Sequence, residues 1–257
     1  MCGIAGIIYR DGARDVGRDM TRMLQSMKHR GPDSTGYALY GTPQNGSLVM
    51  RYKLADANTP RDFDFEDRLR RHRFEVESRL SALGDAETVS GQYHLEKVKG
   101  THAIGHVRMA TESDVDISGA HPYWAYPFSD IAVVHNGQLT NYFMWRRRLE
   151  RSGHRFQSEC DSEIIAVYLA EKMSEGMSLE DAMNLSLDEL DGVFTYICVT
   201  ADALGVAKDE MAAKPLVLYE SDDLVALASE EIAIRAIIDH EIDTYDPYER
   251  EVLVWTR

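Results

Sequence analysis

The sequence predicts one compact domain of the α/β or α+β class, for three reasons. Its 257 residues, 44% of them hydrophobic, are enough to bury a sizeable core. Stretches with the periodicity of strands and of helices alternate along the whole chain. No internal repeat, low-complexity tract or long linker divides them, so we treat residues 1–257 as a single domain.

The expected elements follow from local patterns. Gly3–Tyr9 is a continuous apolar run, which is typical of a buried strand, and the spacing of three and four residues between apolar side chains over 16–27 predicts a helix. The segment SLED at 178–181 is a capping box that opens another helix. Further strands are expected at 36–40, 47–52, 103–107, 131–134, 193–200, 215–219, 224–227 and 252–255, and further helices at 142–151, 161–173 and 231–238.

A charged stretch over residues 62–83 keeps one helical face apolar and predicts an amphipathic helical insertion. On periodicity alone, a surface helix that packs on one side is favoured over a partner-binding helix.

Composition excludes several classes of function. A formal net charge of −15 disfavours nucleic acid and anionic membranes as partners. The three cysteines are too few and too scattered for a disulfide framework or a metal cluster, which fits a reducing compartment. The sequence shows neither a secretory signal nor an apolar stretch of membrane-spanning length. We expect a soluble cytoplasmic protein with no metal and no cofactor, whose partners are small molecules and proteins.

Cys2, in the opening MCGI, is the candidate nucleophile. A lone cysteine near an N-terminus is ordinarily an inert small hydrophobe. Removal of Met1, however, would leave Cys2 with a free α-amine. The reference pKa values are about 8.5 for a thiol and about 7.7–8.0 for an α-amine, so the amine can accept the thiol proton at neutral pH. One residue would then supply both nucleophile and base.

The segment HNG at 135–137 offers donors for the oxyanion that such an attack creates. Asn136 has a side-chain NH2 group, and Gly137 has a backbone N–H on a chain that turns without a Cβ penalty. Asn-Gly is also a common turn dipeptide, and a turn alone is the simpler explanation of this pair.

Charged residues elsewhere suit an α-amino acid. Arg108 ends an expected strand and offers a two-pronged donor for a carboxylate, to which Thr111 could add a hydroxyl. Asp161 opens an expected helix, where a capping role is the simpler one, although it could also hold an ammonium group. Arg30 in HRGPD and His121 in AHPYW are weaker candidates that could merely order loops.

With Cys2 and HNG, these residues describe a site for an α-amino acid that carries a side-chain amide, which is glutamine. Six motifs resemble, in order and approximate spacing, those of class II glutamine amidotransferase domains, which are N-terminal nucleophile hydrolases. They are MCGIAGII, HRGPDSTG, GHVRMAT, AHPYW, VVHNGQLTNY and SECDSEII, spread over roughly residues 2–234.

The resemblance implies a four-layer α/β/β/α sandwich in which Cys2 takes up the γ-glutamyl group of L-glutamine as a thioester and releases ammonia. It implies that Asn136 and Gly137 form the oxyanion hole. It also assigns glutamine binding to three residues, Arg108, Thr111 and Asp161. Arg30 and His121 match positions near the glutamine pocket.

This chain departs from the family pattern in three places. Met109 follows the arginine where some members have an aromatic residue, and Glu112 follows the threonine, so we expect a different pocket wall. The insertion over 62–83 lengthens the connection between HRGPDS and GHVR, and could cover the pocket or dock a partner.

The synthase domain that usually follows a class II glutaminase domain has no room in this chain. We therefore expect a stand-alone subunit, similar to those of N-methylglutamate synthase and glutamate-synthase-like complexes. It would pass ammonia to a synthase subunit on a separate chain within a hetero-oligomer, and would hydrolyse glutamine poorly alone.

Two other hypotheses stay open. The chain could be an N-terminal cysteine hydrolase of another amide, although Arg108 and Asp161 would then have little use. It could also be a non-catalytic regulatory subunit, which an unprocessed Met1 would favour because a blocked amine cannot act as a base.

Overall fold

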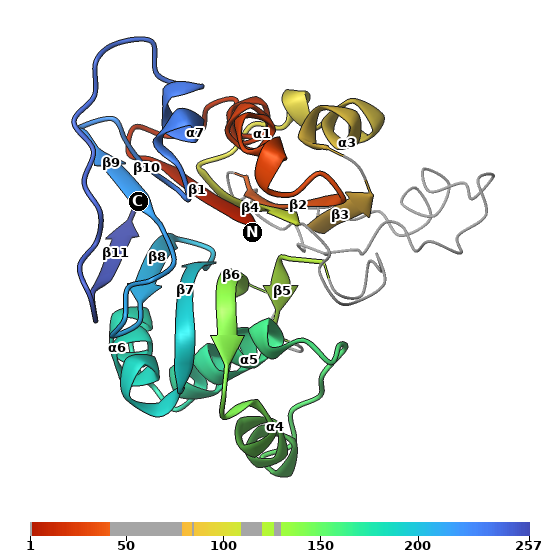
Figure 1. The fold of residues 1–257 in the computed structure, drawn as a ribbon, viewed down its shortest axis with the longest axis vertical. Coiled ribbons are helices and arrows are strands. Elements are labelled where there is room, and N and C mark those ends of the chain that lie inside the picture. The colour runs from red at the N-terminus through yellow and green to blue at the C-terminus, as the bar shows by residue number, and fades with distance from the viewer. Residues whose placement is uncertain (1, 42–78, 84, 109–119, 126–129) are drawn as a thin grey trace, which may run out of the picture.

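Two antiparallel β-sheets are stacked face to face in the computed structural model of the chain (Figure 1). The structure describes residues 2–41, 79–83, 85–108, 120–125 and 130–257. The first sheet has six strands, in the order β3 (Arg79–Leu83), β2 (Ser34–Tyr40), β4 (His102–Arg108), β1 (Gly3–Tyr9), β10 (Leu224–Ala228) and β9 (Val217–Glu220). The second has five, in the order β11 (Val252–Thr256), β8 (Ala203–Lys208), β7 (Gly192–Val199), β6 (Ala132–Leu139) and β5 (Tyr123–Trp124).

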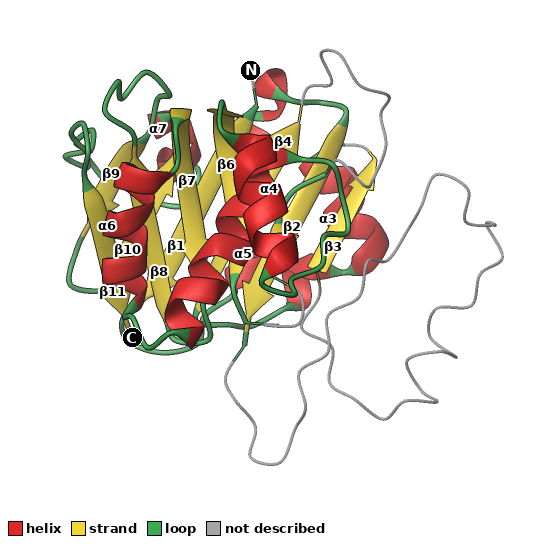
Figure 2. Ribbon diagram, turned by 90° about the horizontal axis from the view of Figure 1, so that it is seen from below, coloured by secondary structure: helices red, strands yellow, loops and turns green. Residues whose placement is uncertain are grey.

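Helices cover the outer face of each sheet. Those on the first sheet are α1 (Val16–Ser26), α3 (Ala86–Tyr93) and the short α7 (Glu231–Arg235). Those on the second are α4 (Tyr142–Arg151), α5 (Asp161–Ser174) and α6 (Leu179–Glu189), which lie across it in Figure 2. In the part of the chain that the structure describes, no helix combines the length and the apolar character needed to cross a membrane.

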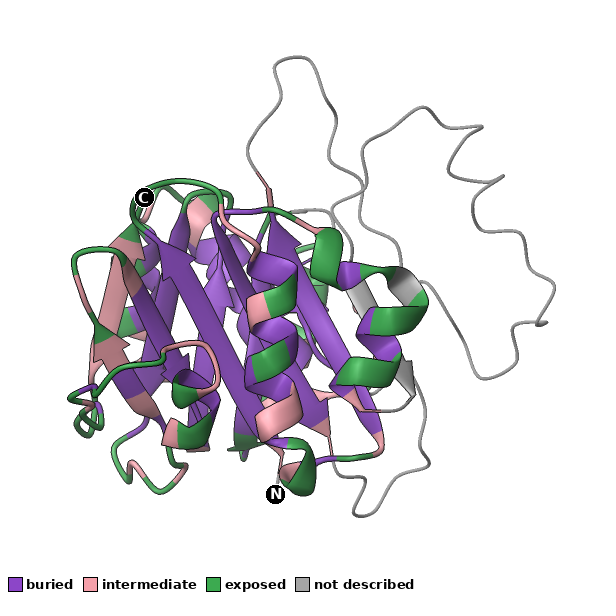
Figure 3. Cartoon of the chain, turned by 90° about the horizontal axis from the view of Figure 1, so that it is seen from above, coloured by how far each residue is buried: buried purple, intermediate pink, exposed green. Residues whose placement is uncertain are grey.

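The alternation of side chains along the strands creates three hydrophobic cores. In β1, Ile4 and Ile8 face the core between the sheets, whereas Ala5 and Ile7 face the core beneath α1 and α7. All seven residues of β1 are buried, which is why this strand is a continuous apolar run (Figure 3). The expected α/β/β/α order of four layers is therefore confirmed.

Local signals fixed several boundaries. The capping box is confirmed: the Ser178 hydroxyl accepts a hydrogen bond from the backbone N–H of Asp181 at 3.1 Å, and α6 begins at the next residue, Leu179. β1 and α1 also begin where the sequence predicts them. Besides β3, the elements that we did not predict are α3, β5 and β8.

The helix expected over 62–83 is wrong at its C-terminal end. Residues 79–83 form strand β3, which pairs antiparallel with β2. Hydrogen bonding to the open edge of β2 outweighs the helical periodicity of these residues. The rest of that expected helix, together with the expected strand at 47–52, lies outside the described residues.

The core between the sheets should contribute strongly to stability. Ile197 of β7 is fully buried and faces Gly6 of β1 across it. We expect Ile197→Ala to lower the free energy of unfolding by about 3 kcal/mol, because it leaves a cavity that the sheets cannot close. The matched control is Ile232→Ala on α7, where the side chain is 53% exposed and the change should stay within about 0.5 kcal/mol. Urea unfolding checks both, and equal losses would contradict the assignment of this core.

Candidate active site

Strand pairing brings Cys2 and Arg108 to the same edge of the fold. β1 and β4 are antiparallel neighbours in which Gly3 pairs with Val107, so Cys2 and Arg108 are the next residues along the two strands. Asn136 comes from β6 in the other sheet, and its Nδ2 donates a hydrogen bond to the Cys2 carbonyl oxygen at 3.1 Å. Three residues predicted from separate motifs therefore lie together, at the start of β1, the end of β4 and on β6.

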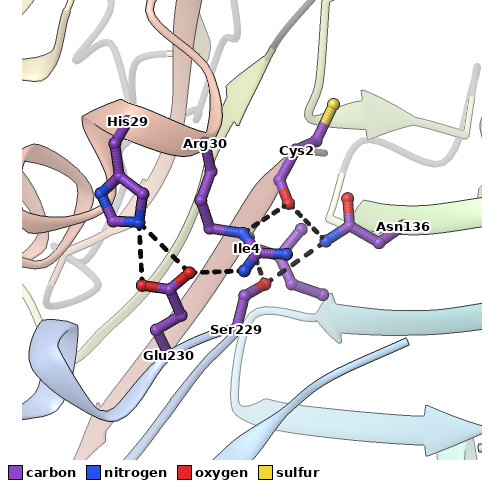
Figure 4. A network of polar contacts seen from close by, with 7 residues as sticks. All are labelled: Cys2, Ile4, His29, Arg30, Asn136, Ser229 and Glu230. Carbon is purple, nitrogen blue, oxygen red and sulfur yellow. Dashed lines mark hydrogen bonds and ion pairs between the residues drawn. The ribbon is translucent and has the colours of Figure 1, made fainter. Parts of the chain in front are cut away.

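The backbone of Cys2 is held by two side chains. Its carbonyl oxygen accepts from Arg30 Nε at 3.1 Å as well as from Asn136 Nδ2. The thiol of this half-buried residue points away from both donors (Figure 4). Burial raises the pKa of Cys160, and raises that of Cys198 to about 12, so both stay protonated at neutral pH. This leaves Cys2 as the candidate nucleophile among the three cysteines.

Ser229 joins the first strand to Asn136. Its hydroxyl accepts from the backbone N–H of Ile4 at 3.0 Å and from Asn136 Nδ2 at 3.3 Å. Its own backbone N–H donates to the Ile4 carbonyl oxygen at 2.9 Å. Both hydrogens of the Asn136 amide are thus engaged, so this group would have to exchange one partner in order to bind an oxyanion.

An ion pair orients Arg30. The Arg30 guanidinium donates to Glu230 at 2.5 Å, and His29 Nε2 contacts the other oxygen of the same carboxylate at 3.0 Å (Figure 4). Burial by itself would raise the pKa of Glu230, but the hydrogen bonds from Arg30 and His29 outweigh it and lower that pKa. An ionised Glu230 therefore supports the arginine that holds the Cys2 carbonyl.

Two glycines make this packing possible. Gly137 has a φ of +143°, and a Cβ there would lie 2.1 Å from the Val193 carbonyl oxygen on β7. A Cβ on Gly31 would lie 2.5 Å from backbone atoms of Arg108, and Asp33 N–H donates to the Arg108 carbonyl oxygen at 3.1 Å. The HRGPDS segment is thereby packed against the end of β4.

Asp161 does not cap α5, although capping was the simpler of its two expected roles. Cys160 occupies the N-cap position without a side-chain capping bond, and Asp161 is the first helical residue. The Asp161 carboxylate instead accepts from the backbone N–H of Leu139 at 2.8 Å, three residues beyond Asn136. This bond ties the start of α5 to the end of β6.

Of the two remaining predicted site residues, the structure describes His121 but not Thr111. His121 is buried, at 8% exposure, and its Nε2 contacts the Ser162 hydroxyl at 2.9 Å. Thr111 lies outside the described residues, as do Met109 and Glu112.

Sequence inspection missed Ser229 and Glu230. They follow the apolar strand β10, in the same way that HNG lies at the end of an apolar run. Polar residues directly after a buried strand were therefore a signal that could have found them.

The ion pair should make stability depend on pH. The pKa of Glu230 is lower in the folded than in the unfolded chain, so its stabilising contribution is complete above the unfolded value of about 4.3 and disappears as the pH falls through the folded value. We expect Glu230→Gln to lose about 1 kcal/mol of unfolding free energy at pH 7, and progressively less as the pH falls below about 4.

Urea unfolding at the two pH values measures this difference. The control is Glu150→Gln, which breaks the more exposed pair between Arg146 and Glu150 on α4. That variant should differ from wild type by less than about 0.5 kcal/mol at either pH. A pH-independent loss in Glu230→Gln would contradict the ionic role.

Known proteins share this sequence and fold. A family model described as a glutamine amidotransferase domain matches residues 106–236. A Methanothermobacter thermautotrophicus protein assigned as a glutamine amidotransferase is 38% identical over 267 residues, covering 85% of this chain and 88% of the relative. The glutamine amidotransferase-like protein GlxB of Rhizobium meliloti is 33% identical, and the match covers 85% of each chain.

A solved structure extends the comparison to the fold. The glutamine phosphoribosylpyrophosphate amidotransferase of B. subtilis superimposes on 99% of this chain with a TM-score of 0.72 and 25% identity. This chain spans 47% of that protein, or about half its length. In sequence and in fold, the chain belongs to the class II glutamine amidotransferase family of N-terminal nucleophile hydrolases.

Proposed function

We propose that the chain hydrolyses the side-chain amide of L-glutamine at Cys2 and passes the ammonia to a synthase subunit on a separate chain. The observation that carries this proposal is the position of Cys2, with its carbonyl held by Asn136 and Arg30 beside the end of β4. The thiol is left pointing away from these contacts (Figure 4).

The reaction begins once Met1 has been removed. The free α-amine of Cys2 takes the thiol proton, and Sγ attacks the amide carbon of glutamine. Asn136 and Gly137 stabilise the oxyanion that forms. The C–N bond then breaks, the leaving nitrogen takes the proton from the α-ammonium group, and ammonia departs from a γ-glutamyl thioester. Attack by water on the thioester releases glutamate and restores the thiol.

Substrate recognition falls to residues around this thiol. Arg108 is the last residue of β4 and lies across the strand pair from Cys2. It would bind the α-carboxylate of glutamine, to which Thr111 would add a hydroxyl. Asp161 would bind the α-ammonium group while it keeps its bond to Leu139. Arg30 acts on the backbone of Cys2.

The lengths of relatives support a separate synthase subunit. The chain covers 88% and 85% of two relatives whose names refer only to glutamine amidotransferase, but 47% of the solved phosphoribosylpyrophosphate amidotransferase. A synthase of the glutamate-synthase or N-methylglutamate-synthase kind would therefore be a separate polypeptide, and the two would form a hetero-oligomer.

Covalent labelling tests the nucleophile. Intact-mass analysis of the purified protein should show that Met1 is absent, and incubation with 6-diazo-5-oxo-L-norleucine should add one adduct, located at Cys2 by peptide mapping. Cys2→Ser should remain unlabelled, whereas Cys198→Ala should label like wild type because the Cys198 thiol is fully buried in β7 and stays protonated. A processed, folded protein that forms no adduct would rule out the glutaminase, and a retained Met1 would favour the non-catalytic subunit.

Asp161 distinguishes glutamine from other amides. Asp161→Asn keeps an acceptor for Leu139 N–H but removes the charge. We expect the concentration of 6-diazo-5-oxo-L-norleucine at half-maximal labelling rate to rise about tenfold or more, with a smaller effect on the maximal rate, since a charge-assisted hydrogen bond is lost.

The control compares two substrates, glutamine and 4-carbamoylbutanoate, which lacks the α-amine. Wild type should strongly prefer glutamine, and Asp161→Asn should narrow that preference. Equal turnover of both amides by wild type would instead favour a hydrolase of another amide.

A further inference from the structure

We propose that Ser162 is a positioning residue, which fixes the oxyanion donors relative to Asp161 through two buried histidines. This inference rests on the proposed glutaminase function and adds a residue to that site. Ser162 follows Asp161 in the first turn of α5 and is 2% exposed. Its hydroxyl lies 2.8 Å from His135 Nδ1 and 2.9 Å from His121 Nε2.

A single hydroxyl between two imidazoles restricts the arrangement of protons. The hydroxyl has one hydrogen, so at most one ring can accept it and the other ring must donate its N–H; if the hydrogen goes to Asp161 Oδ1 instead, both rings must donate. Burial lowers the pKa of His135, which keeps this ring neutral at neutral pH, with one N–H. Ser162 thereby couples the tautomer and the orientation of His135 to those of His121.

His135 passes this orientation to the oxyanion donors. His135 directly precedes Asn136 on β6. Its ring lies close to Gly137, the residue after Asn136, since a Cβ on Gly137 would be 2.9 Å from His135 Nε2. The ring therefore occupies the space beside Gly137 that a side chain would fill, so its orientation sets the surroundings of the backbone whose N–H is a proposed donor. Among the described residues, His135 Nε2 has no hydrogen-bond partner, so the bond from Nδ1 to Ser162 is the one that holds the ring in place.

His121 extends the same contact to the substrate-binding strand. Its ring stacks on that of His106, with centroids 4.0 Å apart and planes 20° apart. His106 is buried on β4, two residues before Arg108, and pairs with Ile4 of β1. One hydroxyl on α5 thus connects the strand of the oxyanion donors with the strand that carries Arg108.

The sequence neighbours of Ser162 complete its surroundings. Asp161 Oδ1 lies 3.4 Å from the hydroxyl, and Cys160 Sγ lies 3.5 Å from it. Replacing Ser162 by alanine would leave two buried imidazole nitrogens without this partner, next to a carboxylate that is proposed to bind the substrate. The His135 ring could then turn, and the donors would lose their fixed geometry.

The test compares three serine variants by their labelling at Cys2 with 6-diazo-5-oxo-L-norleucine. Ser162→Ala removes the hydroxyl, and Ser162→Thr keeps it. The matched control is Ser186→Ala on α6, because Ser186 is also fully buried and its hydroxyl lies 2.7 Å from the Tyr196 hydroxyl, away from the site. Thermal unfolding of each variant separates a loss of stability from a loss of reactivity.

We expect Ser162→Ala to lower the maximal labelling rate about tenfold, as the loss of a buried hydrogen-bond partner predicts. Ser162→Thr should recover most of the rate, and Ser186→Ala should label like wild type even if it is equally destabilised. Nitrogen NMR of the imidazoles should show one tautomer for His135 in wild type and a mixture in Ser162→Ala.

Wild-type labelling rates in a folded Ser162→Ala, or an unchanged His135 tautomer, would overturn the positioning role. An equal loss of rate in Ser186→Ala at equal stability would also overturn it. If Ser162→Ala does not fold, a labelling rate in Ser162→Thr no higher than about a tenth of wild type would count against the hydroxyl, and recovery would support it. Failure of wild type itself to label at Cys2 would instead remove the proposed function.

Discussion

The pair of hydrogen bonds to the Cys2 carbonyl oxygen is the interaction on which the rest of the site depends. One donor, Asn136, belongs to the second sheet, and the other, Arg30, follows the first helix on the outside of the first sheet. A residue at the end of a chain ordinarily frays, because it has neighbours on one side only. Here the backbone of Cys2 is tied to both halves of the sandwich, so its thiol has a defined position.

The polar groups behind these two donors explain how a buried network stays stable. Glu230 balances the charge of Arg30, and Ser229 satisfies a backbone N–H of β1 while it holds Asn136. Buried polar groups are tolerated when each finds a partner, and a half-satisfied network is worse than an apolar one. The end of β10 therefore matters to the site although it carries no proposed reactive atom.

Much of the fold could be predicted from local patterns, because a fully buried strand such as β1 and a capped helix such as α6 leave clear sequence signals. β3 could not, since its pairing with β2 depends on contacts with residues distant in sequence. α3 was missed because its start is marked mainly by a single cap, Asp85, which accepts from Thr88 N–H at 2.9 Å.

The candidate site divides in the same way. Cys2, Asn136 and Arg108 belong to motifs with chemistry of their own, and the structure brings them together. Ser229 lies 225 residues from Ile4 in sequence, and no local pattern could show that they touch. Ser162 is similar: it gains meaning only when strand pairing and packing bring His121 and His135 to the same helix end.

The engagement of Asn136 has an energetic consequence for turnover. Both amide hydrogens are already bonded, so recruiting one to an oxyanion requires breaking a bond whose net strength is about 1 kcal/mol. Under the proposed mechanism, this makes the unliganded state a resting state with a built-in barrier. Any contact that draws Ser229 away from Asn136 would lower that barrier while the bond to Cys2 stays in place, so under the proposed function a bound subunit could accelerate the reaction without touching glutamine.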